Sequence, residues 1–119
     1  MTTNELLQLD CRIESNKAIL QKALKHLKPL SRYEKEIPIE SLEKVIFATS
    51  RKYEVSIKDV RPSPFSNARE SIWHSSIIDD RRPLSPYDVY GISIYEVLCK
   101  SVIKMHSMVK KNEVKERKQ

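Results

Sequence analysis

Glycine is nearly absent from this chain, with one residue among 119. Tight β-hairpins with primed turns need positive φ angles, which glycine adopts most readily, so the sequence disfavours such hairpins. A glycine-rich phosphate-binding loop is also excluded. The many leucine, lysine and glutamate residues favour helices. We therefore predict an all-α fold: a small helical domain with a helix-turn-helix-like carboxyl-terminal part and a long amino-terminal helix.

Cysteine, histidine and long apolar runs are also scarce. Cys11 and Cys99 stand alone, which fits neither a disulfide framework nor a zinc motif. The three histidines are far apart and lack metal-ligand spacing. No apolar run is long enough to span a bilayer, and the amino terminus lacks a signal-peptide layout. These absences predict a cytoplasmic, non-enzymatic protein with no metal, no cofactor and no membrane partner.

Positive charge is in excess. The chain has 22 lysine and arginine residues against 16 aspartate and glutamate residues, a formal charge of +6. The excess grows toward the end, where the residues from Cys99 onward include seven basic and two acidic ones. A basic end of this kind favours a polyanionic partner such as DNA. The alternative is a soluble basic tail without a partner.

The amino-terminal segment reads as one helix. Thr2 and Glu5 have capping-box spacing, and apolar residues continue at roughly heptad spacing to about Leu27, with Asn16 in the seam. Residues 1–28 are therefore predicted to form a helix that either packs on its own domain or serves as a dimerisation arm.

Proline and charge divide the rest of the chain. Pro29 stops the first helix. The predicted parts that follow are a linker at 29–38, a helical domain at 39–111 and a basic flexible tail at 112–119.

Capping signals place further helices within the helical domain. They predict a short helix near 57–60, a helix from Asn67 to about Ile78, and a brief helix that starts at Ser85-Pro86 and ends at Gly91. Two more helices are predicted within 93–111, with starts at Ser93 and Ser101.

The pair of helices at 93–111 resembles a helix-turn-helix, whose second helix reads the major groove of DNA. Lys100, Ser101 and Lys104 would then face base edges. Lys110 and Lys111 would contact phosphates. The alternative is that these lysines merely solvate a terminal helix.

Three short motifs suggest a family: Val55-Ser56-Ile57-Lys58-Asp59-Val60, Asn67-Ala68-Arg69-Glu70 and Ile92-Ser93-Ile94-Tyr95-Glu96-Val97. Residues 39–111 resemble the carboxyl-terminal DNA-binding domain of the bacterial replication initiator DnaA. The resemblance implies a Trp-repressor-like helical fold and places Arg61 and Arg69 where that family contacts the DNA backbone. The chain departs from the family at Leu98-Cys99-Lys100, where an Asp-His pair is expected, and it has no ATPase module.

We therefore expect a protein that binds duplex DNA, a regulator or replication accessory of the kind common in phages and mobile elements. A homodimer through the amino-terminal helix would raise its affinity. The rival hypothesis is a small helical adaptor that binds a replication or transcription protein instead of DNA. In that case the amino-terminal helix, the loops 61–66 and 79–86 and three tyrosines would form the docking surface: Tyr33, Tyr87 and Tyr90.

Overall fold

The computed structural model describes residues 1–49, 53–60 and 72–117, with side chains described through Lys111 except that of Val60. Its elements, in chain order, are α1 (Thr3–Leu7), α2 (Glu14–Lys25), the 3-10 turn η1 (Lys28–Leu30), α3 (Ile39–Thr49), β1 (Tyr53–Val60), β2 (Ile72–Asp79), β3 (Arg82–Gly91) and α4 (Ile94–Arg117). The three strands form an antiparallel sheet in the order β1-β2-β3.

The all-α prediction is wrong, because strands stand where three of the helices were expected. The short helix near 57–60 lies within β1, the helix ending near Ile78 overlaps β2, and the helix from Ser85 to Gly91 lies within β3. The physical reason is side-chain alternation. Along β1, the half-buried or buried Tyr53, Val55 and Ile57 alternate with exposed polar residues, and this period of two fits a half-buried strand.

The turn between β2 and β3 is made without glycine. Asp80 and Arg81 form it, and the backbone N–H of Arg81 donates to Oδ1 of Asp79 at 3.0 Å. No described residue has a positive φ angle. A short aspartate side chain that binds the backbone two residues on is a common way to stabilise a turn. Scarce glycine therefore did not exclude a hairpin.

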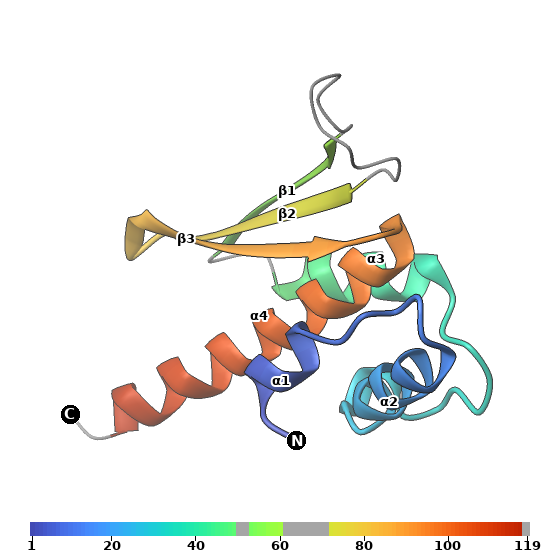
Figure 1. Ribbon diagram of the computed structural model, residues 1–119. Coiled ribbons are helices and arrows are strands. Elements are labelled where there is room, and N and C mark those ends of the chain that lie inside the picture. Colours follow the sequence, from blue (N-terminus) through green and yellow to red (C-terminus); the bar gives the residue numbers. More distant parts are fainter. Residues whose placement is uncertain (50–52, 61–71, 118–119) are drawn as a thin grey trace.

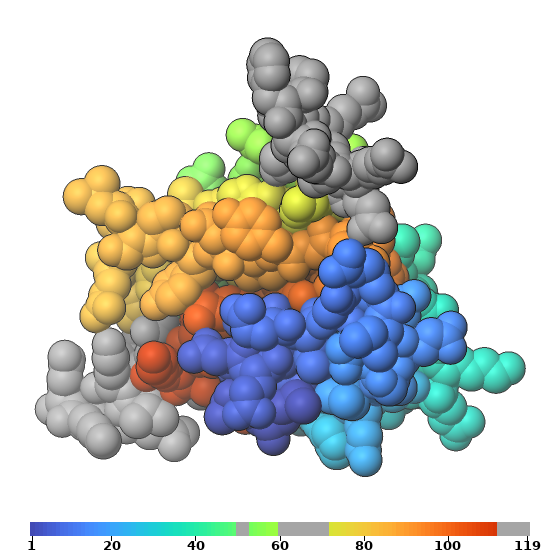
Figure 2. All heavy atoms as spheres, in the orientation of Figure 1, coloured from blue at the N-terminus to red at the C-terminus, as the bar shows by residue number. Residues whose placement is uncertain are grey.

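Helix α4 is the central element (Figure 1). It contacts β2 and β3 on one side and α1 and α2 on the other, and α3 packs beside it. Figure 2 shows β3 above α4 and the amino-terminal helices below it, so that little of α4 is visible from this side. The fold thus has three layers, with α4 and α3 in the middle.

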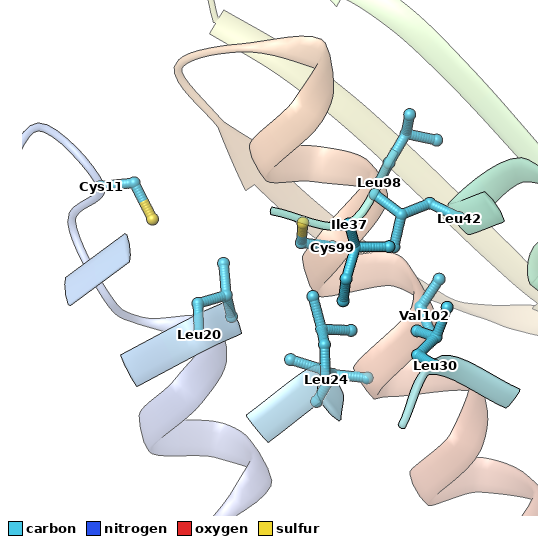
Figure 3. Close-up of a cluster of buried hydrophobic side chains, with 10 residues drawn as sticks. Cys11, Leu20, Leu24, Leu30, Ile37, Leu42, Leu98, Cys99 and Val102 are labelled. Carbon is cyan, nitrogen blue, oxygen red and sulfur yellow. The ribbon is translucent and has the colours of Figure 1, made fainter. Parts of the chain in front are cut away.

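Two clusters of buried side chains hold these layers together. The sheet-side core joins the strands to α4 and contains Tyr53, Ile77, Val89, Val97, Met105 and Met108. The helix-side core joins α4 to the amino-terminal segment (Figure 3) and contains Cys11, Leu20, Leu24, Leu30, Ile37, Leu42, Leu98, Cys99, Val102 and Ile103. Residues on both sides of the predicted linker at 29–38 thus share one core.

The predicted amino-terminal helix is two helices, because the chain turns between α1 and α2. Asp10 makes this turn by accepting hydrogen bonds from the backbone N–H of Arg12 and from Arg12 Nε, both at 3.0 Å. These bonds hold the pKa of Asp10 at about 2, below its ordinary value. The side-chain amide of Asn16 donates to the Asp10 carbonyl at 2.9 Å. Asn16, which would set the register if this segment were a dimerisation arm, thus stabilises a turn within the chain.

The predicted helix-turn-helix is a single helix. α4 continues through Ser101 without a turn. Ser101 Oγ donates to the Val97 carbonyl at 2.6 Å, a bond back along the same helix. Ser93 does cap α4 as predicted, because its Oγ accepts from the Glu96 backbone N–H at 3.1 Å.

Candidate functional site

Lys100 and Ser101, the predicted base-reading residues, are inside the protein. Lys100 is 4% exposed and Ser101 is 0% exposed. Groove reading requires side chains that reach the surface, and the structure does not place these two side chains there.

Lys100 instead joins three parts of the fold. Its Nζ lies 2.7 Å from Glu96 Oε1 in a buried ion pair, and it donates to the Leu9 carbonyl at 2.8 Å. Glu96 in turn accepts at 2.7 Å from the backbone N–H of Ile92, the residue before the cap Ser93. The pair therefore fixes the end of β3, the start of α4 and the link between α1 and α2. A buried charge is tolerated when it is paired in this way.

Lys104, the third predicted base reader, is half-buried against the sheet. Its Nζ lies 4.2 Å from the ring centroid of Tyr87, which is close enough for a cation–π contact. Burial lowers the pKa of Lys104, and the nearby charge of Lys111 lowers it further. The structure therefore does not bring Lys104 into a shared exposed site with Lys100 and Ser101.

The other predicted contacts are divided. Arg61 and Arg69, the expected backbone contacts, lie outside the described residues. Lys110 and Lys111 are exposed, near the carboxyl end of α4. They line a groove of about 590 Å³ between α1, α2 and α4, which we call the α1–α2–α4 groove.

The α1–α2–α4 groove has an apolar floor and a basic rim. Its floor is formed by Leu6 from α1, Ala23 from α2, Leu27 just after α2, and Ile103 from α4. The rest of its lining is Thr3, His106, Ser107, Lys110 and Lys111. Among the described residues that line it, none is acidic. Partly buried apolar side chains in a concave surface are typical of a binding groove.

A second hollow of about 530 Å³ lies between α2 and the start of α4. Tyr95 crosses its base, donating from its hydroxyl to the Ile37 carbonyl and accepting from Gln21 Nε2, each at 2.6 Å. Cys11 also lines it, and burial, together with the nearby Glu96, raises the pKa of this thiol to about 11. A thiol that stays protonated is a poor nucleophile, so this hollow does not suit cysteine catalysis.

The outer face of the sheet carries the described residues that sequence reasoning missed. His74 on β2 stacks on Tyr90 on β3, with ring centroids 4.8 Å apart and 23° between the planes. His74 Nε2 also lies 2.8 Å from Asp88 Oδ1. The signal was present, because residues of the same parity in a strand share a face, but it is informative only once the segment is known to be a strand.

The three tyrosines of the adaptor hypothesis are not equivalent. Tyr33 hydrogen-bonds to Ser41 and Arg32, and these bonds lower its pKa. Tyr87 contacts Lys104. Tyr90 is 57% exposed. Of these three, Tyr90 therefore offers the most surface to a partner.

Neither a metal centre nor a membrane span is found in the part of the chain that the structure describes. No group of three or more histidine, cysteine or acidic residues is placed to hold a metal ion among these residues. No helix among them is both long enough and apolar enough to cross a membrane.

Comparisons of the chain with protein-family models, with curated proteins and with solved structures found no match. They point neither to the replication-initiator family nor to any other, so function is argued from the geometry of this chain.

Proposed function

We propose that this protein is a non-enzymatic interaction adaptor that docks an acidic amphipathic helix of a partner protein in the α1–α2–α4 groove. One observation carries the proposal: the groove combines a floor of Leu6, Ala23, Leu27 and Ile103 with a rim whose charged residues are Lys110 and Lys111.

The apolar floor supplies the attraction. A helix that lies in a groove inserts apolar side chains spaced at i, i+3, i+4 and i+7. Fully burying one leucine-sized side chain contributes about 1.5–3 kcal/mol. Two such anchors contribute about 3–6 kcal/mol, and after the cost of ordering the partner they support a weak complex, with a dissociation constant of about 100 μM or higher.

Lys110 and Lys111 determine which partner helix is preferred. Lys110 and Lys111 are exposed, and no acidic residue lines the described groove to neutralise them. Exposed charges on an interface rim change association rate and specificity more than affinity. An acidic helix is therefore favoured over a basic one of the same hydrophobicity.

A peptide titration tests the proposal. We expect a helical peptide of about 15 residues, with leucines on one face and glutamates on the other, to bind the full chain. A peptide of the same composition in scrambled order should bind at least about tenfold more weakly, because it presents no apolar face.

Two variants locate the site. Ala23→Glu places a carboxylate in the apolar floor and should weaken binding at least about tenfold. Lys110→Glu with Lys111→Glu should weaken it about 3- to 10-fold. The matched control, Lys35→Glu with Lys44→Glu, makes the same charge change at exposed sites outside the groove. Equal losses in the control and rim variants, or no binding of the ordered peptide, would contradict the proposal.

Duplex-DNA binding is a second candidate, as a regulator or replication accessory, and its support is charge. Lys110 and Lys111 are exposed. Seven basic and three acidic residues of the sequence lie where the structure describes no side chains, which is at residues 50–52, 60–71 and 112–119. Neutralised phosphates make binding fall steeply with salt. A salt series with random duplex DNA tests this candidate, and no retardation at low salt would remove it.

We place the adaptor in the cytoplasm, because a reducing compartment suits its two free cysteines, Cys11 and Cys99.

A further inference from the structure

The outer face of the sheet presents an ordered row of three side chains. Strand pairing sets Lys58 on β1 opposite His74 on β2, and His74 opposite Tyr90 on β3. The row therefore crosses the whole described sheet at one level. In Figure 1 the helices of the protein lie on the other side of the sheet, so none of them covers this row.

Asp88 orients the His74 ring, which in turn stacks on Tyr90. Its Oδ1 lies 2.8 Å from His74 Nε2, and the His74 ring stacks on Tyr90 with 23° between the planes. The side chain of His74 is 23% exposed, whereas Tyr90 is 57% exposed. One face of the Tyr90 ring is therefore supported by His74, and much of the remaining ring surface meets solvent.

The β1 end of the row carries a positive charge, that of Lys58. Lys58 is exposed beside His74, while the carboxylate of Glu54 belongs to the opposite end of β1, where Glu54 pairs with Ile78. Asp88, two strands away on β3, is bonded to His74. A supported aromatic ring with a cation two strands away, about 10 Å by the strand spacing, matches a planar base near a phosphate of the same single strand.

We infer that the Lys58–His74–Tyr90 row binds single-stranded nucleic acid. A base stacks on the exposed ring of Tyr90, and Lys58 neutralises a neighbouring phosphate. A duplex does not fit this role, since its base faces are already stacked on one another. The site lies on the opposite side of the fold from the α1–α2–α4 groove and does not depend on the function proposed for that groove.

The test is fluorescence anisotropy of the full chain with labelled single strands of about 10 nucleotides, and with a duplex of the same length. Tyr90→Ala should weaken single-strand binding about 5- to 100-fold, whereas Tyr90→Phe, which keeps the ring, should stay within about twofold. The control Leu84→Ala alters a side chain of the same strand that is 96% exposed and outside the row, and it should have no effect. Lys58→Gln should reduce the slope of log affinity against log salt by about 0.7, the value for one phosphate contact on a single strand.

Three results would overturn the inference. One is the absence of single-strand binding at low salt. Another is equal binding by the Tyr90→Ala variant and the unaltered chain, which would assign the affinity to charge elsewhere. The last is a Tyr90→Ala loss that is as large for the duplex as for the single strand, which would show that no unpaired base stacks on this ring. Circular dichroism of each variant verifies that the fold is intact, and Lys58→Gln remains informative if Tyr90→Ala does not fold, because an unchanged salt slope would contradict the row.

Discussion

The two ends of α4 use the same residue type in opposite ways. In its first half, Lys100 is 4% exposed and is bound to Glu96 and to the Leu9 carbonyl. Near its other end, Lys110 and Lys111 are exposed and line a groove. The difference follows from position, because the sheet and the amino-terminal segment enclose the first half of α4. A lysine adds to a binding surface only where the fold leaves it outside.

The largest expected effect comes from removing the buried member of this comparison. Lys100→Met leaves the carboxylate of Glu96 buried without its cation, and we expect a loss of about 3–5 kcal/mol in the free energy of unfolding, measured in urea. Lys110→Met, at the exposed end, should change it by less than about 0.5 kcal/mol.

A double variant sharpens this result. Glu96→Gln added to Lys100→Met removes the unpaired charge and should recover part of the loss, so the two changes will not be additive. Equal effects of Lys100→Met and Lys110→Met would contradict the burial of Lys100.

The enclosure of α4 can be tested from the other side of the helix-side core. Leu24 on α2 is 0% exposed, and Leu24→Ala should cost about 2–5 kcal/mol of unfolding free energy through lost burial and a cavity. Ile19→Ala, on the same helix but 37% exposed, is the matched control and should cost less. A small effect of Leu24→Ala would mean that α2 is a separate arm and does not enclose α4.

A smaller effect is expected at the point where α4 begins. Ser93→Ala removes the hydroxyl that accepts from the Glu96 backbone N–H at 3.1 Å. Loss of such a cap costs about 0.5–2 kcal/mol. Ser93→Asp should retain most of the stability, because aspartate also caps helices. If urea unfolding of Ser93→Ala matches that of the unaltered chain, the cap does not stabilise the enclosed end of α4.

The least disruptive probe of the enclosed half of α4 uses the thiols of Cys99, on that helix, and of Cys11, which is buried in the same core. Burial raises the pKa of Cys11 to about 11 and that of Cys99 to about 12, from an ordinary value of 9.0. The unfolded chain therefore loses these protons first, so the stability they contribute is full below pH 9 and is lost as the pH rises toward 11 and 12. We expect the urea midpoint to fall over this range.

Thiol labelling provides the matching kinetic test. At pH 8 a disulfide reagent should modify both cysteines slowly in the native protein and rapidly in denaturant, since a buried, protonated thiol reacts poorly. Native-state labelling at the rate of a free cysteine would contradict the enclosure of this half of α4.

Local capping signals predicted helix starts correctly at Thr2 and Ser93, but they also predicted starts at Ser56 and Ser85, which lie in strands. The Thr2–Glu5 and Ser93–Glu96 spacings were correct because each cap involves neighbours in sequence. Ser56 and Asp59 have the same spacing within β1. There the alternation of apolar and polar residues was the stronger signal, and a capping pair cannot by itself separate the two states.

The burial of Lys100 depends on contacts that sequence spacing does not reveal. Its pairing with Glu96 at i, i+4 was visible as a pattern. Its bond to the Leu9 carbonyl joins residues 91 positions apart. Local patterns on α4 therefore placed Lys100 on an exposed, DNA-facing surface, whereas the tertiary fold encloses it. The groove could not be predicted for the same reason, since its walls come from three helices.

The most direct test of the account is an NMR titration of the isotope-labelled chain with the acidic amphipathic peptide. The account predicts amide shift changes at Leu6, Ala23, Leu27 and Lys110, which line the groove, and none at Lys100 or Ser101. Changes centred on Lys100 and Ser101, or an unperturbed groove at saturating peptide, would contradict it.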